Sequence, residues 1–323
     1  MRAFAHDRFT YPLPEGHRFP LGRYRMLREA IESTGLAEVL EAPPADDADL
    51  LLAHDPRYLE RVAHGRLTDR EQRGLGLPWS PQLVERGRRS VGATLAAARA
   101  ACVEGAAVNL GGGTHHAFAA SGRGFCTFND VAVAVRRLRG DGTVRRVLVV
   151  DLDVHQGDGT NALLGPDPLT TCAGINGGAN YPFRRVPGDV EEDLPDGTGD
   201  DAYLEALGRL LPAALARGAP DLCIYLAGAD PYEDDRLGRL AVTRAGLVER
   251  DRMVRDRMRA TGVPVCVLLA GGYGRRIEDT VAINLATAIS RQGIVIRADY
   301  MHLTRSFTAM IGSYLGIYRG LPR

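Results

Sequence analysis

Residues 147–158 decide the fold: they read Val-Leu-Val-Val-Asp-Leu-Asp-Val-His-Gln-Gly-Asp. The first four are apolar without alternation, which predicts a strand buried on both faces, as in a parallel sheet. Similar apolar runs lie at residues 50–53, 106–110, 222–226 and 265–269. Segments with the helical period of apolar residues separate them, at 23–33, 82–102, 129–139, 201–217 and 243–261. Strand and helix in alternation predict a single α/β domain with a doubly wound, mostly parallel sheet flanked by helices.

The domain boundaries follow from shifts in composition. We expect a catalytic domain over residues 1–291 and a separate C-terminal tail over 292–323, where Ile, Tyr, Met, Ser and Thr accumulate and Asp299 is the only acid. Within the domain, residues 42–49 and 174–200 are rich in Gly, Asp and Pro or carry few apolar residues, so we expect surface loops there.

The charged residues exclude several classes of protein. The 323-residue chain has 40 acidic and 40 basic residues, and every basic residue is Arg. Without lysine there is no Schiff base, no Walker-A lysine and no pyridoxal-phosphate anchor. A net charge of zero also argues against direct nucleic-acid binding, which relies on a clustered basic excess.

Neither a membrane segment nor a cysteine framework is indicated. The sequence lacks a run of about 18 apolar residues and the basic-then-apolar layout of a signal peptide, so we expect a cytoplasmic protein without a membrane partner. The five cysteines never form a Cys-x-x-Cys pair, which argues against disulfides and a thiolate zinc site. The sequence does not indicate an oligomeric state.

Unusual residues follow four of the predicted strands, in segments 111–116, 151–158, 227–230 and 270–274. Parallel α/β sheets bind ligands outside the carboxyl ends of their strands. We therefore expect these four segments to converge on one site.

Asp153 and His155 are the first candidate metal ligands. Residues two apart on an extended segment point the same way, so this carboxylate and imidazole can face one ion. Asp230, after another predicted strand, can complete the set. Three protein ligands leave a coordination position open, which is typical of catalytic zinc rather than structural zinc.

The adjacent histidines His115 and His116 are candidates for proton transfer. Two neighbouring buried imidazoles cannot both be charged cheaply, so we expect their pKa values to separate. Asp151 and Asp158 are candidate carboxylates that orient the imidazoles. Tyr273, in a Gly-Gly-Tyr-Gly turn, can present a hydroxyl to a developing oxyanion.

Five ordered segments carry a resemblance to a known family. Residues 111–118 (GGGTHHAF), 124–130 (GFCTFND), 151–160 (DLDVHQGDGT), 227–238 (AGADPYEDDRLG) and 269–274 (LAGGYG) resemble the zinc-dependent histone deacetylases, which include bacterial deacetylase-like amidohydrolases. The resemblance covers roughly residues 1–290. Gln156 and the segment 15–24 look like the class IV branch and its bacterial relatives.

The resemblance implies roles for individual residues. It implies one Zn²⁺ ligated by Asp153, His155 and Asp230. It implies a tandem general base and acid, a transition-state hydrogen-bond donor, and two carboxylates paired with the histidines, namely His115, His116, Tyr273, Asp151 and Asp158. A narrow tunnel for the acyl-lysine stem would have Phe125 as one wall and Tyr181 or Phe183 as the other, and Gly124 would supply backbone near the substrate amide. A structural K⁺ near the backbone carbonyls of residues 151–155 is also implied.

The implied function is hydrolysis of an amide, with removal of acetyl or longer acyl groups from lysine side chains. The partner would be an acyl-lysine protein, and the alternative is a small-molecule amidohydrolase acting on acetylpolyamines or similar amines. A ureohydrolase of the arginase type is disfavoured because Gly157 stands where its Asp-x-His-x-Asp motif needs a second carboxylate. An inactive binding module is disfavoured because every catalytic position is filled.

Overall fold

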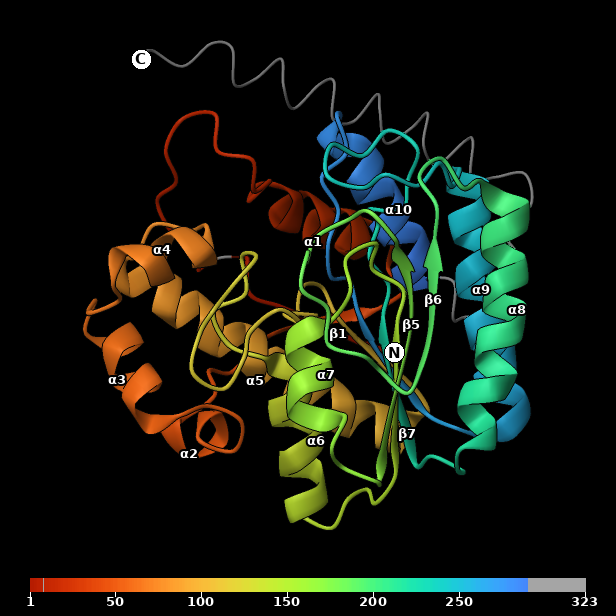
Figure 1. The fold of residues 1–323 in the computed structure, drawn as a ribbon, viewed down its shortest axis with the longest axis horizontal. Helices are drawn as coiled ribbons and strands as arrows, with labels where there is room; N and C mark the ends of the chain where they lie inside the picture. The colour runs from red at the N-terminus through yellow and green to blue at the C-terminus, as the bar shows by residue number, and fades with distance from the viewer. Residues whose placement is uncertain (8, 290–323) are drawn as a thin grey trace.

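Eight parallel strands form one sheet in the computed structural model of the chain, which describes residues 1–7 and 9–289 (Figure 1). Every strand pairing is parallel, which confirms the predicted α/β architecture. The strands, in their order across the sheet, are β2 (Glu38–Glu41), β1 (Arg2–Ala5), β3 (Ala106–Asn109), β8 (Val265–Leu268), β7 (Leu222–Leu226), β4 (Val147–Asp151), β5 (Thr170–Gly177) and β6 (Val190–Leu194).

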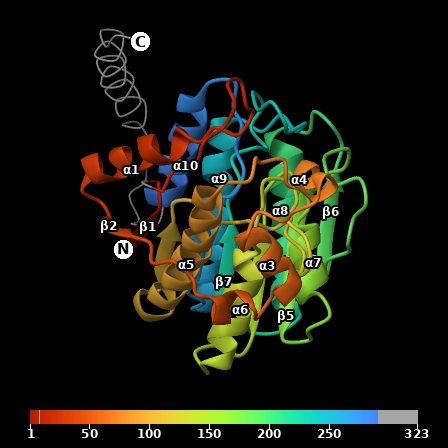
Figure 2. The same cartoon turned by 90° about the vertical axis from the view of Figure 1, so that its left-hand side faces the viewer.

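Helices cover both faces of the sheet (Figures 1 and 2). One face packs against α5 (Pro81–Glu104), α6 (Asp130–Gly140) and α7 (Asp158–Leu164). The opposite face packs against α1 (Arg23–Thr34), α8 (Asp200–Ala216), α9 (Arg244–Thr261) and α10 (Ile277–Ile289). The shorter helices lie beyond α5; they are α2 (Asp47–Leu50), α3 (Pro56–Ala63) and α4 (Asp69–Leu75).

Strand β4 shows why the apolar runs do not alternate with polar residues. Leu148 and Val150 belong to the apolar cluster under α8 and α9, whereas Val147 and Val149 belong to the cluster under α5 and α6. Successive side chains of a strand point to opposite faces, and both faces are covered here. All four side chains are therefore buried, as the sequence predicts for this stretch.

The long helices begin close to the predicted residues because their first turns are capped. The Ser80 hydroxyl accepts a hydrogen bond from the Leu83 N–H at the start of α5, and the Asn129 side chain accepts one from the Ala132 N–H at the start of α6. Each cap satisfies a backbone donor that has no partner inside the helix.

The prediction of a strand at residues 50–53 is wrong. Helix α2 ends at Leu50 and a turn follows, so the surface loop expected at 42–49 is also partly helical. The Asp46 carboxylate caps this helix by accepting from the Asp49 N–H. A run of four apolar residues is too short to distinguish a strand from a buried helical turn.

The prediction of one long loop at residues 174–200 is also wrong. The end of β5 and all of β6 lie within it. Strand β6 reads Val-Glu-Glu-Asp-Leu and lies at the edge of the sheet, where acidic side chains are exposed to solvent. The edge strands β2 and β6, and β1 and β5 next to them, were not predicted, because none shows a distinctive apolar run.

The predicted boundary after residue 291 and the predicted tail over 292–323 lie outside the described residues. Within residues 1–7 and 9–289, no helix combines the length and the apolar character needed to cross a membrane.

Buried His54 links α2 to the segments that lead to the site. The Asn129 N–H donates to His54 Nε2 (2.9 Å), so the ring is neutral and its Nδ1, 3.1 Å from the Phe118 carbonyl oxygen, is the donor there. Burial lowers the pKa of His54 to about 4. Protonation would remove the acceptor for Asn129.

We predict that protonation of His54 destabilises the folded protein as the pH falls. Its pKa is about 4 when folded and about 6.5 when unfolded, so the unfolded chain binds the proton first. The free energy of unfolding should fall from pH 6.5 to 4, by about 3 kcal/mol at most from this group. Urea unfolding should show a shallower pH dependence for His54→Gln than for the wild type. The exposed His64→Gln serves as a control and should keep the wild-type slope; equal slopes for all three proteins would refute the assignment.

Candidate active site

The four segments expected to converge follow the four central strands β3, β8, β7 and β4, which are neighbours in the sheet. These strands end at the same edge, the upper one in Figure 1. The residues after each strand therefore meet above the centre of the sheet, as predicted from their positions in the sequence.

Asp153, His155 and Asp230 come together at this edge. Their candidate ligand atoms all lie within 4.8 Å of one another, and all three residues are buried. His155 Nδ1 lies 3.0 Å from Asp153 Oδ1 and 3.2 Å from Asp230 Oδ2. The order of the strands explains the contact, because β4 and β7 pair directly.

This group of residues fits a divalent metal ion. Asp153 Oδ2 accepts from the Gly271 N–H (2.7 Å) and Asp230 Oδ1 accepts from the Val154 N–H (3.0 Å). None of the described residues forms a hydrogen bond with the buried Asp230 Oδ2, which the His155 ring approaches, and a Cβ atom at position 271 would overlap this oxygen. A buried carboxylate oxygen needs a partner, and two carboxylates with one imidazole are a ligand set suited to zinc and similar ions.

The pKa values of Asp230 and His155 also favour a cation bound between the carboxylates. Burial and the neighbouring Asp153 carboxylate raise the pKa of Asp230 to about 7. Burial opposes the charged form of His155, but the neighbouring Asp153 and Asp230 carboxylates more than offset it and raise its pKa to about 10. Two carboxylates this close are costly to charge together unless a cation lies between them.

The two histidines after β3 each face a carboxylate. His115 Nδ1 lies 2.7 Å from Asp151 Oδ2, and His116 Nδ1 lies 2.7 Å from Asp158 Oδ1. The two imidazole rings are 4.1 Å apart between centroids, and all four residues are buried. In each pair the carboxylate fixes the ring and leaves Nε2 for another partner.

The pKa values of the two histidines separate, as expected. Burial lowers the pKa of both, but the Asp151 and Asp153 carboxylates more than offset it for His115 and raise its pKa to about 9. Burial and the neighbouring His115 lower the pKa of His116 to about 4. The pair therefore combines one charged and one neutral imidazole at neutral pH.

Tyr273 follows β8, and its ring lies 6.4 Å from that of His155. The Asp235 carboxylate, which the sequence analysis did not identify, accepts from the Tyr273 N–H (2.5 Å) and from the N–H groups of Leu237 and Gly238. Asp235 thereby ties the loop after β7 to the turn that carries the tyrosine. The sequence did not distinguish Asp235 from the acidic residues Glu233 and Asp234 that precede it.

Arg23 supports the same turn from α1. Its buried guanidinium donates to the carbonyl oxygens of Gly272 (2.8 Å) and Ala270 (2.5 Å). It lines an inner cavity of about 80 Å³ that Asp153 and His155 also line. Sequence reasoning missed Arg23, because one arginine among forty basic residues carries no signal of burial.

An outer groove of about 710 Å³ leads to the site. Gly124 and Phe125 line one part of it, and the Phe125 ring lies 6.0 Å from that of Tyr273. Tyr181 and Phe183 also line it; the Tyr181 ring lies 4.9 Å from that of His116, whereas Phe183 is 88% exposed. Of the two alternatives left open by the sequence, Tyr181 is the one that faces the histidines.

A buried arginine of α9 holds the segment between β7 and Asp230. The Arg250 Nη1 donates to the Gly228 carbonyl oxygen (2.6 Å), and its Nε donates to Asp251 (2.9 Å). Tyr225 donates to the same carboxylate (2.5 Å). Arg250 therefore connects its buried ion pair with Asp251 to the loop that positions Asp230.

An eight-stranded parallel sheet with an Asp-His-Asp group and two carboxylate-paired histidines at its carboxyl edge defines an α/β protein of the arginase/deacetylase class. The histidine pair places the chain within this class more narrowly. Residues 17–289 match the family model described as histone deacetylase domain, and the chain belongs to the histone deacetylase family.

Known proteins from several lineages are similar to the chain. An uncharacterized protein of a Picosynechococcus species is 40% identical over 85% of this chain and 93% of its own length. Histone deacetylase 2 of Arabidopsis thaliana is 32% identical over 86% of this chain and 75% of its own. The crystal structure of an HDAC homolog from Aquifex aeolicus superposes with a TM-score of 0.79 at 21% identity, over 94% of this chain and 88% of that one, which supports the shared fold.

We predict that Arg250→Met destabilises the protein by about 3 kcal/mol or more, because it leaves the Asp251 carboxylate buried without its cation. Arg252→Met is the matched control: Arg252 is two residues away on α9, half-exposed, and paired with Glu249 and Asp256, so its loss should cost less than about 1 kcal/mol. Urea unfolding measures both free energies. Equal losses would contradict the assigned role of Arg250.

Proposed function

We propose that the protein is a zinc-dependent amidohydrolase that removes acetyl or longer acyl groups from lysine side chains. The observation that carries the proposal is the meeting of a metal-ligand group, two carboxylate-paired histidines and a tyrosine at the inner end of one groove. Membership of the histone deacetylase family supports the hydrolysis of an acyl amide.

Asp153, His155 and Asp230 would hold the zinc ion. When bound, zinc supplies a Lewis acid that polarises the acyl carbonyl and lowers the pKa of water toward about 7. The chain's contribution is a rigid, buried ligand set whose remaining oxygens are fixed by backbone N–H donors, as at Val154 and Gly271.

The two histidines would move the protons. His116 lines the outer groove, whereas His115 lies deeper and lines the inner cavity, so His116 is the better placed to take a proton from the attacking water. Asp158 holds its Nδ1 and leaves Nε2 as the acceptor. The pair then returns the proton to the leaving amine, because expulsion of an unprotonated amine anion is too costly.

Tyr273 would donate a hydrogen bond to the oxyanion that develops on the acyl oxygen. Its ring faces His155 across the inner end of the groove, and Asp235 and Arg23 hold its backbone. Phe125 and Tyr181 would enclose the aliphatic stem of the substrate.

We predict that Tyr273→Phe lowers kcat on an acetyl-lysine peptide by roughly 10²–10³-fold, because a donor to the oxyanion is lost. The zinc content, measured on the same preparation, should be unchanged because the phenol is not a ligand. An unchanged kcat would exclude Tyr273 from the reaction.

Hydrolysis of a panel of substrates tests the proposal as a whole. Acetyl-, myristoyl- and trifluoroacetyl-lysine peptides should be cleaved and the reaction should stop when a chelator is added, whereas chelator-insensitive hydrolysis would overturn the zinc assignment. Acetylated polyamines in the same panel test the alternative substrate class. We further propose that the chain is related to the class IV branch of the family and that it is cytoplasmic. A structural K⁺ would lie near residues 151–155.

A further inference from the structure

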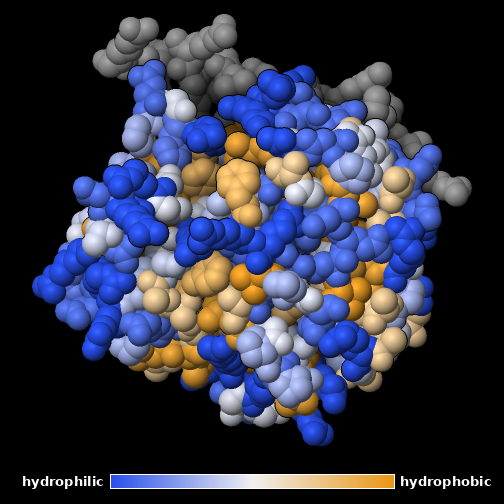
Figure 3. Space-filling model, viewed as in Figure 1, coloured by the Kyte–Doolittle hydropathy of each residue, from blue (hydrophilic) through white to orange (hydrophobic). Residues whose placement is uncertain are grey.

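The outer groove is lined by cations. Among the described residues that line it are Arg18, Arg236 and Arg239, and none of the described lining residues is Asp or Glu. The exposed Arg123 and Arg184 directly adjoin the lining residues Gly124 and Phe183, and one exposed acid, Glu15, adjoins Gly16. Figure 3 shows hydrophilic side chains over most of the upper part of the molecule, with hydrophobic ones exposed between them.

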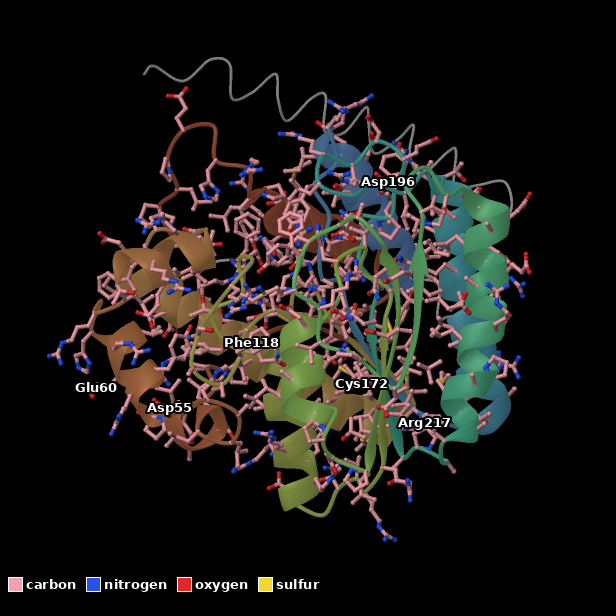
Figure 4. The ribbon with its side chains drawn as sticks, viewed as in Figure 1. Asp55, Glu60, Phe118, Cys172, Asp196 and Arg217 are labelled. Carbon is pink, nitrogen blue, oxygen red and sulfur yellow. The ribbon has the colours of Figure 1, made fainter. Side chains whose placement is uncertain are left out.

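These cations are poorly neutralised by the protein itself. Within the described part of the chain, no carboxylate lies within ion-pair distance of Arg18, Arg123, Arg184 or Arg236. Arg236 instead donates to the Arg275 carbonyl oxygen (3.2 Å). Arg239 pairs with Asp196 at 3.2 Å, but both side chains are about half-exposed, so solvent screens the pair. Asp196 lies at this upper edge of the sheet (Figure 4).

The positive charge of the groove favours an acyl-lysine polypeptide over an acylated polyamine as the substrate. A polyamine is a polycation, and the arginines around the groove would repel it. Carboxylates on either side of an acyl-lysine would be attracted, and such complementarity raises the rate of encounter and the specificity. The groove volume of about 710 Å³ also exceeds the space that one acyl-amine stem fills, and the exposed Phe183 adds an apolar contact at its rim.

We propose that the substrate of this site is an acyl-lysine within an acidic stretch of polypeptide, whose carboxylates are recognised by the arginines of the groove. The inference rests on the proposed deacylase function and specifies its substrate. The acyl-lysine stem would pass between Phe125 and Tyr181, while carboxylates of the flanking residues would lie against Arg18 and Arg236.

The test compares three acetyl-lysine peptides of one length, with Glu, Ala or Arg at the positions flanking the acyl-lysine. At low ionic strength kcat/KM should be roughly tenfold higher for the Glu peptide than for the Ala peptide, and lowest for the Arg peptide. The difference should shrink in about 0.5 M salt because salt screens exposed charges. Acetylspermidine should be cleaved less efficiently than the Glu peptide.

Variants locate the effect. The double variant R18Q/R236Q should reduce the Glu-to-Ala ratio of kcat/KM toward one. Arg217→Gln is the matched control, because Arg217 is half-exposed and lies at the opposite edge of the sheet from the groove (Figure 4), so it should keep the wild-type ratio.

Two failures can be told apart. If the Ala peptide is cleaved but the Glu peptide has no advantage, or if acetylspermidine is the best substrate, the acidic-substrate inference is overturned while the amidohydrolase stands. If none of the peptides and no acetylspermidine is cleaved, the proposed function itself fails, and the inference fails with it.

Discussion

The closeness of two buried carboxylates, Asp153 and Asp230, is the constraint on which the rest of the site depends. Each follows a central strand of the sheet, and each is fixed by a backbone N–H donor, from Gly271 and Val154. Two like charges in a dry site are unfavourable unless a positive charge compensates them. The fold forces this conflict, because β4 and β7 are neighbours and both end at this edge.

The surrounding structure is arranged around that conflict. His155 lies within 3.2 Å of both carboxylates, and Arg250 holds the Gly228 carbonyl oxygen of the loop that carries Asp230. Glycine at 271 leaves the space that a Cβ would take from the Asp230 oxygen. The Asp235 carboxylate and the Arg23 guanidinium hold the turn that carries Tyr273. The phenol ring of Tyr273 therefore lies beside His155. The Asp-His-Asp group, the two carboxylate-paired histidines and Tyr273 thus lie close together at one end of the groove.

The sequence predicts the centre of this fold better than its edges. The runs at β3, β4, β7 and β8 are mostly apolar without alternation because both faces of the central strands are covered, and the polar residues at and after their ends mark the site. Strands β2 and β6 lie at the edges of the sheet and carry glutamates, so their sequences resemble loops. The prediction of a strand at residues 50–53 was wrong because the conformation of this short apolar run depends on its packing and on the Asp46 cap, which the apolar pattern does not show.

The same distinction applies to the site. Residues that lie next to one another in short motifs, such as Asp153 and His155, could be predicted, and their partners at the ends of other strands followed from the topology of parallel sheets. Arg23, Asp235 and Arg250 act through buried contacts with backbone groups that are distant in the sequence. No local pattern records such contacts. The charge of the groove likewise depends on loops that the fold brings together.

The central claim is that Asp153, His155 and Asp230 bind one metal ion together, and metal stoichiometry tests it most directly. The purified chain, loaded with zinc and dialysed, should retain one zinc ion per chain by elemental analysis. Asp230→Asn, which removes one charge while keeping the shape of the side chain, should retain far less under the same conditions. Equal zinc in the variant and the wild type would contradict the account, as would a wild-type chain that retains none.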